Sequence, residues 1–364
     1  MLIKEIIEEL NNFAPLELQE DYDNSGLNVG NPENEISGIL ISLDITPEII
    51  NEAIENNCNL IISHHPLIFK GIKKITGKND VEKSIIKAIK NDISIYCGHT
   101  NFDNHYLGVN NKIAEKLNLN NLQILDNKEN IYRKISVYIP FESVEKVKNA
   151  MFETGAGKLG NYDCCSYDTI GLGSFRANEK SNPYIGEKNQ IHFEKETKIE
   201  MIYPKYLENK IVSAMLSAHP YEEVAYNLIN NEMKNKFSGA GIIGSFEEEI
   251  TEIQLFEKLK SKFEISNIRH TKLLNKKIGK IAICGGSGAF LINNAIQAKV
   301  QAYITADLKY HDFFLAENKI LLIDIGHYES EQFTKEIFFD IIHKKNVNFA
   351  VKISQKNTNP INNY

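Results

Sequence analysis

Short β-branched apolar runs alternate with amphipathic helical runs over the first 125 residues, and this alternation restricts the chain to an α/β fold. The apolar runs are typical of buried strands, and the segments between them repeat apolar residues at helical spacing. Such an order predicts a parallel, doubly wound sheet with right-handed crossovers. The predicted strands are 38–44, 59–63 and 94–97, and the predicted helices are 3–13, 47–56, 81–91 and 109–117.

The α/β pattern stops near residue 132 and returns near residue 244. The stretch between has β-α-β-β-α-β character, which predicts an independent α+β domain of the ferredoxin-like type. We therefore expect one discontinuous α/β domain, residues 1–130 and 245–364, with a domain inserted at 131–244. The helices predicted from here on are 141–152, 205–218, 222–231, 251–263, 290–298 and 330–344, and the strands are 133–139, 280–284, 302–305 and 319–324.

Composition and charge exclude several classes of function. The formal net charge of −7 leaves no broad basic surface, so we expect no bulk nucleic-acid binding. The apolar runs are far too short to cross a bilayer, and the acidic N-terminal helix differs from a signal peptide, so we expect no membrane partner. Five scattered cysteines without a CxxC pair fit a reducing compartment, and we expect a cytoplasmic protein.

Three clusters of histidines and acids follow predicted strands. His64 and His65 come directly after 59–63, Asp103 follows 94–97, and His327 and Glu331 follow 319–324. Each cluster alone has an ordinary explanation: solvated loop histidines, a turn or capping carboxylate, and a surface pair four residues apart on a helix. If all three strands belong to one sheet, however, the clusters meet at its carboxyl edge, where open α/β sheets bind ligands.

Three imidazoles and two carboxylates are suitable ligands for two divalent cations. A carboxylate that bridges two metals, with open positions for water, is typical of hydrolytic centres. Without a cysteine in the set, the donors suit Zn, Fe, Mn, Co or Ni. The residues therefore predict a dinuclear metal site made of His64, His65, Asp103, His327 and Glu331.

Other polar residues lie at the same predicted edge. His99, Asp307 and His311 are candidates for acid–base catalysis or for orienting the ligands, with a helix cap or a surface histidine as the alternative. Asp44 has the same ambiguity. The turn Gly285–Gly288 either presents backbone N–H groups to an anion or serves as a tight turn. In the insert, His219 is interpreted as a packing residue.

Five motifs occur in order along the chain: Asp23–Gly30 (DNSGLNVG), Ser63–Phe69 (SHHPLIF), His99–Asp103 (HTNFD), Cys284–Gly288 (CGGSG) and Gly326–Glu331 (GHYESE). With these motifs, the sequence resembles the NIF-three-like family, whose members are often called GTP cyclohydrolase I type two homologues. The resemblance covers 1–125 and 245–364, and the segment 219–223 (HPYEE) resembles long members that carry an extra regulatory-protein-like domain.

The resemblance implies that His65 and Asp103 hold one ion, His64 and His327 hold the other, and Glu331 bridges both. It also implies a toroidal homohexamer whose sites face an inner cavity. The family label implies attack of a metal-bound water on the purine ring of GTP. We expect a metal-dependent hydrolase of a nucleotide or another phosphorylated small molecule; the alternative is a non-catalytic, hexameric metal-binding or regulatory scaffold.

Overall fold

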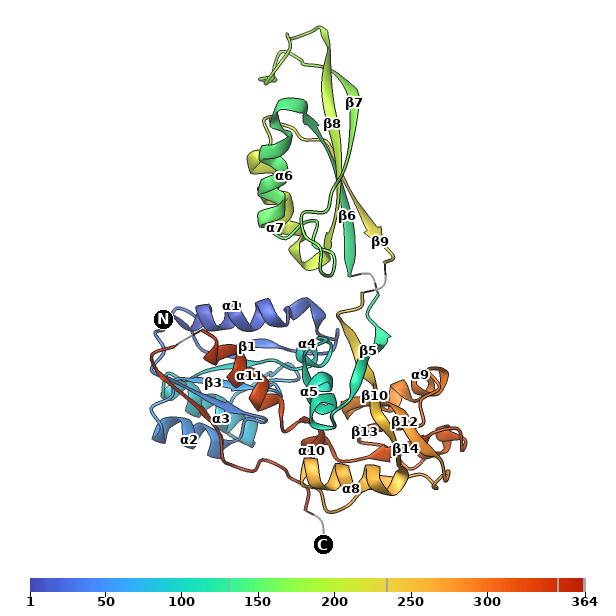
Figure 1. Ribbon diagram of the computed structural model, residues 1–364. Helices are drawn as coiled ribbons and strands as arrows, with labels where there is room; N and C mark the ends of the chain where they lie inside the picture. The colour runs from blue at the N-terminus through green and yellow to red at the C-terminus, as the bar shows by residue number, and fades with distance from the viewer. Residues whose placement is uncertain (130, 234, 346, 363–364) are drawn as a thin grey trace. The chain divides into compact units, whose positions relative to one another are not determined.

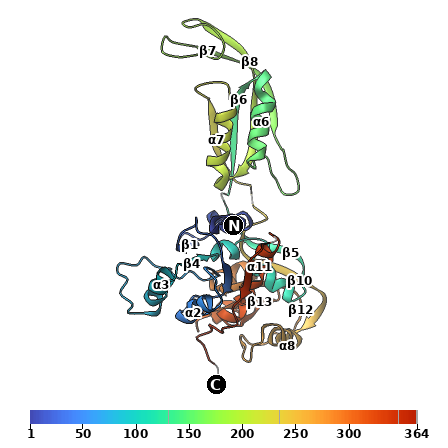
Figure 2. The same ribbon diagram turned by 90° about the vertical axis from the view of Figure 1, so that its left-hand side faces the viewer.

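The computed structural model describes residues 1–129, 131–233, 235–345 and 347–362, and its ribbon is shown in Figures 1 and 2. Two compact units divide the chain: Met1–Asn127 with Lys236–Tyr364, and Lys128–Asn235. The position 244/245, where the sequence places the end of the insert, lies inside strand β10 of the larger unit. Each unit has its own hydrophobic core.

A five-stranded sheet with the order β1-β4-β3-β2-β15 forms one half of the larger unit. Strands β15, β2, β3 and β4 are parallel, and β1 is antiparallel to β4. Helices α2 and α3 cover one face, and α1 and α11 pack on the other. The elements are α1 (Ile3–Phe13), β1 (Gly26–Val29), β2 (Gly38–Ser42), α2 (Pro47–Glu55), β3 (Leu60–Ser63), α3 (Asp80–Lys90), β4 (Ser94–Cys97), α4 (Thr100–Asp103), α5 (Val109–Lys116), α11 (Thr334–His343) and β15 (Ala350–Ile353).

A six-stranded sheet with the order β11-β14-β13-β12-β10-β5 forms the other half. Strands β12, β13 and β14 are parallel, and the other three strands pair antiparallel. One core joins residues of both sheets. The elements are β5 (Asn120–Asn127), β10 (Gly239–Thr251), α8 (Glu252–Phe263), β11 (Arg269–His270), β12 (Lys277–Ser287), α9 (Ile292–Gln297), β13 (Ala302–Ala306), β14 (Leu321–Asp324) and α10 (His327–Glu331).

The mixed α/β class is confirmed, but the prediction that one sheet carries all three His/acid clusters is wrong. Strands β3 and β4 belong to the five-stranded sheet, whereas β14 pairs with β13 and β11 in the six-stranded sheet. Sheet membership is decided by long-range pairing, which local hydrophobic periodicity does not encode.

The smaller unit is an antiparallel sheet with the order β7-β8-β6-β9. Helices α6 and α7 pack on one face of it, as Figures 1 and 2 show. The helix predicted at 222–231 is wrong: 226–231 is strand β9, which pairs with the edge of β6 and thereby completes the sheet. The elements are β6 (Tyr132–Pro140), α6 (Val144–Glu153), β7 (Tyr167–Arg176), β8 (Ile191–Pro204), α7 (Glu208–Ala218) and β9 (Tyr226–Asn231).

Capping side chains fix where several helices begin. Thr46 accepts a hydrogen bond from the backbone N–H of Ile49 at the start of α2, and Thr251 and Gln254 form a reciprocal capping box at α8. In the described ranges, helices are too short or too polar to cross a membrane.

Candidate metal centre

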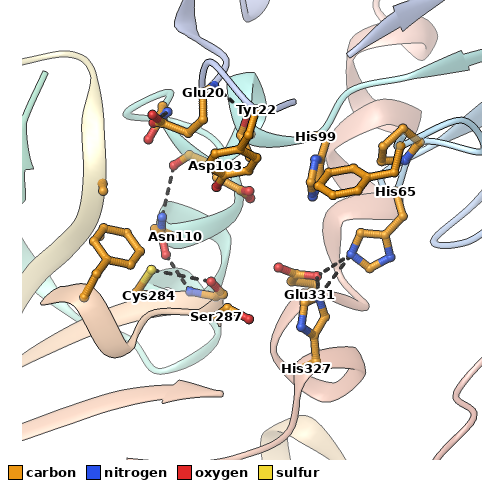
Figure 3. A pocket seen from close by; sticks show the side chains of 18 residues that line it. Glu20, Tyr22, His65, His99, Asp103, Asn110, Cys284, Ser287, His327 and Glu331 are labelled. Atoms are coloured by element: carbon orange, nitrogen blue, oxygen red, sulfur yellow. Dashed lines mark hydrogen bonds and ion pairs between the residues drawn. The ribbon is translucent and has the colours of Figure 1, made fainter. Parts of the chain in front are cut away.

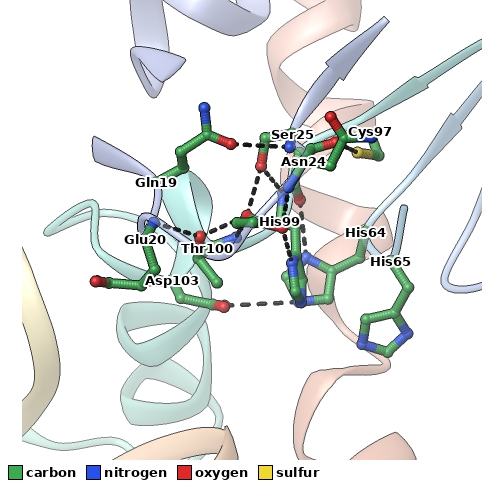
Figure 4. Close-up of polar contacts among 12 residues, drawn as sticks. Gln19, Glu20, Asn24, Ser25, His64, His65, Cys97, His99, Thr100 and Asp103 are labelled. Carbon is green, nitrogen blue, oxygen red and sulfur yellow. Dashed lines mark hydrogen bonds and ion pairs between the residues drawn. The ribbon is translucent and has the colours of Figure 1, made fainter. Parts of the chain in front are cut away.

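The three predicted clusters converge on one point of the larger unit. His64 and His65 directly follow β3, Asp103 ends the short helix α4 after β4, and His327 and Glu331 begin and end α10 after β14. The carboxyl ends of parallel strands from two sheets therefore face each other, and each sheet contributes part of the site. Figure 3 shows His65, Asp103, His327 and Glu331 around a cavity of about 490 Å³, and Figure 4 shows His64 beside Asp103.

Glu331, His65 and His327 form the tighter group of donor atoms. The Glu331 Oε2 atom lies 2.9 Å from Nε2 of His65 and 2.9 Å from Nε2 of His327. The two Nε2 atoms are 3.1 Å apart. Three potential ligand atoms from both sheets thus surround one small volume.

His64, Asp103 and Glu331 form a second group that shares the same carboxylate. His64 donates through Nδ1 to the Gly98 carbonyl at 2.8 Å, so its Nε2 points a lone pair 3.6 Å from Oδ1 of Asp103. Both atoms are buried and lack a hydrogen-bond partner within the described residues. A separation of 3.6 Å is too long for a hydrogen bond, and buried unsatisfied acceptors are costly. A cation between them would satisfy both.

These separations fit metal coordination. Ligand atoms about 2.0–2.2 Å from a tetrahedral ion lie roughly 3–4 Å from one another, and the His64 Nε2 atom is 3.6 Å from Asp103 and 3.7 Å from Glu331. The grouping differs from the one that the resemblance implies, since His64 lies with Asp103 and His65 lies with His327. The Gly98 carbonyl draws the His64 ring toward β4 and α4, which explains the exchange.

An acceptor fixes the far nitrogen of each imidazole. Nδ1 of His65 donates to Asp44 at 2.7 Å, and Nδ1 of His327 donates to Asp307 at 2.7 Å. Because Nδ1 of His64 likewise donates to the Gly98 carbonyl, the Nε2 atom of each of the three rings faces the candidate metal site. Carboxylates and carbonyls in this position set the tautomer and orientation of metal-binding histidines. Asp44 and Asp307 are therefore orienting groups.

Burial and hydrogen bonds set the charges of the donors. Burial disfavours charge on His65 and His327, but the carboxylates beside them raise the pKa of His65 to about 10 and that of His327 to about 11. Burial lowers the pKa of His64. Burial and the Glu331 charge hold the pKa of Asp103 well above its usual range, whereas the three imidazoles overcome burial and keep the pKa of Glu331 well below it.

His99 belongs to the edge of the cavity. Its Nδ1 donates to Asp23 at 2.7 Å, and its ring packs edge-on against the rings of His64 and His65. Asp23 also accepts hydrogen bonds from Thr100, which ties the motif around Asp23 to the start of α4; Figure 4 shows His99 and Thr100 in this network. The motif that contains Asp23 can be recognised in the sequence, but the role of Asp23 follows only from its contact with His99 in the folded chain.

The remaining candidates lie elsewhere. His311 is exposed, rests against the rings of Tyr310 and Phe314, and is not among the residues that line the cavity. His219 belongs to the smaller unit, where its Nε2 donates to the Tyr138 carbonyl at 3.0 Å.

The glycine-rich end of β12 makes room for the shared carboxylate. Gly286 has a φ of +61°, and a Cβ there would lie 2.2 Å from Oε1 of Glu331. The backbone N–H of Gly285 donates to Asn110, and that of Gly286 donates to Ser330. Both backbone N–H groups therefore already have acceptors within the protein. The role of these glycines is to let the backbone pass close to α10.

The C-terminal tail links the two halves of the centre. Thr358 donates to Oδ2 of Asp44 at 2.5 Å, and Asn359 donates to Glu329 on α10 at 2.8 Å. Consecutive tail residues therefore contact the carboxylate that orients His65 and the helix that carries Glu331. Thr358 and Asp44 are 314 positions apart, and Asn359 and Glu329 are 30 apart, so the sequence carries no local signal for either contact.

The chain is similar to known proteins over nearly its whole length. The sequence matches the family described as Duf34/NIF3 (NGG1p interacting factor 3) over residues 1–360. A GTP cyclohydrolase 1 type 2 homolog of Staphylococcus epidermidis is 35% identical over 365 residues, which cover 99% of each protein. The crystal structure of a Bacillus cereus protein related to NIF3 is 34% identical with a TM-score of 0.86, covering 100% of this chain and 99% of that one. A Staphylococcus aureus crystal structure is 31% identical with a TM-score of 0.79, at the same coverage.

Metal binding should release protons. The raised pKa values of His65 and His327 keep both rings protonated near neutral pH without a metal, so a cation must displace a proton from each ring. We expect release of roughly two protons at about pH 7 and an apparent affinity that rises with pH. Isothermal titration of the metal-free protein in buffers of different ionisation enthalpy measures this release. Affinity that is constant between about pH 6 and 8 would contradict it.

The contact between Thr358 and Asp44 should tune the affinity for metal. Replacing the Asp44 carboxylate by a neutral amide in Asp44→Asn should weaken metal binding by roughly 10–100-fold, and Thr358→Val should weaken it by a smaller factor. If Thr358 acts through Asp44, the double variant binds no more weakly than Asp44→Asn alone. Thr358→Ser, which keeps the hydroxyl, is the control. Additive losses in competition titrations with a chelator would show that the two residues act independently.

Proposed function

This chain belongs to the Duf34/NIF3 family, and we propose that it is a metal-dependent hydrolase with a dinuclear centre whose substrate is a nucleotide or another phosphorylated small molecule. The observation that carries the proposal is the pair of donor groups that share the buried Glu331 carboxylate. Such a shared carboxylate is typical of two-metal hydrolytic sites. The name of the S. epidermidis relative, a GTP cyclohydrolase 1 type 2 homolog, is consistent with hydrolytic chemistry.

In this proposal, His64 and Asp103 hold one divalent cation, His65 and His327 hold the second, and Glu331 bridges them. The cations are Zn, Fe, Mn, Co or Ni, because the donors are imidazole nitrogens and carboxylate oxygens. When bound, the pair supplies a water of lowered pKa, about 7, and a positive field for developing anionic charge.

The chain's own residues have distinct roles in the reaction. Asp44 and Asp307 keep the Nε2 atoms of His65 and His327 aimed at the centre. His99, fixed by Asp23 at Nδ1, keeps Nε2 for proton exchange at the edge of the cavity. The open cavity beside Asp103 and His99 admits the substrate.

Substitution of the bridging carboxylate tests the proposal. Because even residues behind the ligands change metal affinity by roughly 10–100-fold, Glu331→Gln should reduce metal content at both positions and reduce turnover by more than roughly 100-fold. Glu336→Gln is a matched control, since Glu336 pairs with Lys116 outside the cavity. The measurements are elemental analysis and a nucleotide panel assayed with each of the five metals.

The nucleotide panel also distinguishes a hydrolase from a non-catalytic metal-binding scaffold. A protein that binds two cations per chain, loses them in Glu331→Gln, and turns over no phosphorylated compound with any metal would be a metal-binding or regulatory scaffold. Turnover that persists in Glu331→Gln would instead show that the active site lies elsewhere in the protein.

We also propose finer structural assignments. The β-α-β-β-α-β order of the smaller unit and its strand order β7-β8-β6-β9 support a ferredoxin-like, regulatory-protein-like domain. The free state of all five cysteines supports a cytoplasmic location.

A toroidal homohexamer is proposed from the family resemblance. Sedimentation velocity of the full chain should then give a single species about six times the monomer mass of 41.4 kDa. A monomer or dimer at micromolar concentration would contradict the assembly.

A further inference from the structure

Within its described lining, the cavity beside the metal centre offers no unpaired cationic side chain to a substrate, because the protonated rings of His65 and His327 are already paired with Asp44, Asp307 and Glu331. Its lining includes Glu20, Asp103 and Glu331, but no lysine or arginine among the residues that the structure describes there. The amides of Asn104 and Asn110 are engaged with neighbouring acceptors. The carboxylates of the lining therefore repel an anionic group that enters this cavity, and the bound cations attract it.

Aromatic rings supply the apolar part of the lining. Phe69 and Tyr22 contact each other with ring centroids 6.4 Å apart, and the Phe69 ring also lies 6.2 Å from the His99 ring. Phe290 belongs to the segment after β12 and also lines the cavity. Their side chains are 67% (Tyr22), 44% (Phe69) and 63% (Phe290) exposed, so they present open faces. Such faces suit a flat, uncharged ring.

We infer that the substrate is a phosphate monoester of an aromatic or heteroaromatic compound, oriented with its single phosphate toward the donors of the metal centre and its ring against Tyr22, Phe69 and Phe290. The inference rests on the proposed hydrolase function and specifies its substrate class. A volume of about 490 Å³ accommodates a molecule of this size.

This orientation determines the bond that breaks. The oxygen of water bonds to phosphorus, the P–O bond to the organic group breaks, and its electron pair leaves with the alcohol oxygen. That oxygen takes a proton, so the ester and water give the free alcohol and hydrogen phosphate. Water is the only co-reactant, and no electron transfer occurs.

The opposite orientation fits the cavity less well. If a purine ring of GTP faced the metal ligands, its triphosphate would occupy the rest of the cavity, whose lining includes Glu20, Asn104 and Asn110. No lysine or arginine of the described lining would neutralise that charge there. Polyphosphates are normally held by such side chains or by additional Mg²⁺. Ring opening of GTP is therefore disfavoured relative to hydrolysis of a monophosphate.

Binding of inorganic phosphate locates the anion without requiring turnover. Calorimetric titration of the full-length protein with orthophosphate should show binding to the metal-loaded form and at least roughly 10-fold weaker binding to the metal-free form. Equal affinity of both forms would overturn the inference, because protein groups would then hold the anion.

Product analysis separates this inference from the broader hydrolase proposal. Incubation of the metal-loaded protein with an aryl phosphate, GMP and GTP should release orthophosphate from the monoesters, with kcat/KM at least roughly 10-fold lower for GTP. Formate release from GTP would uphold a hydrolase and overturn the monoester inference. Absence of hydrolysis with both cations bound would overturn the hydrolase proposal and, with it, this substrate assignment.

The aromatic contact has a matched pair of variants. Phe290→Ala should raise KM for the aryl phosphate by roughly 5- to 10-fold, leaving orthophosphate affinity unchanged. Phe314→Ala is the control, because Phe314 is 64% exposed and lies outside the cavity lining. Equal increases in KM for both variants, or a parallel loss of orthophosphate affinity in Phe290→Ala, would contradict the proposed orientation.

Discussion

The buried carboxylate of Glu331 is the constraint on which the rest of the larger unit depends. A charge in a protein interior requires charged or hydrogen-bonding partners, since its desolvation is expensive. Its partners here are imidazoles from the loop after β3 and from its own helix, so the five-stranded and six-stranded sheets must meet at this point. Gly286 and the hydroxyl of Ser330 meet the same requirement, because they let the end of β12 approach α10.

Much of this centre follows from local sequence. Strand-like runs end directly before His64 and three residues before His327, and ligands in α/β proteins gather at such ends. Periodicity also locates most helices, because an amphipathic face is a local property. Periodicity predicts a helix at 226–231, where pairing with β6 produces a strand instead. It also does not predict that β14 belongs to a different sheet from β3 and β4. Those outcomes depend on hydrogen bonds between distant strands.

The spacing of the residues in the sequence also does not predict which donors group together. His64 and His65 are adjacent, yet the acceptor behind each ring sends them to different groups: the Gly98 carbonyl holds one and Asp44 holds the other. Thr358 reaches Asp44 from the end of the chain. These contacts can be identified only from the three-dimensional structure, whereas the candidate ligand residues can be identified from the sequence.

The charge distribution connects the fold to specificity. The acids that would hold the cations also make the cavity hostile to free anions, so affinity for a phosphate depends on the metals rather than on the protein surface. The uncharged part of a ligand then meets the aromatic rings around Phe69. A site built in this way would couple substrate binding to metal loading, because without cations the protonated rings of His65 and His327 are already paired with carboxylates and do not attract a further anion.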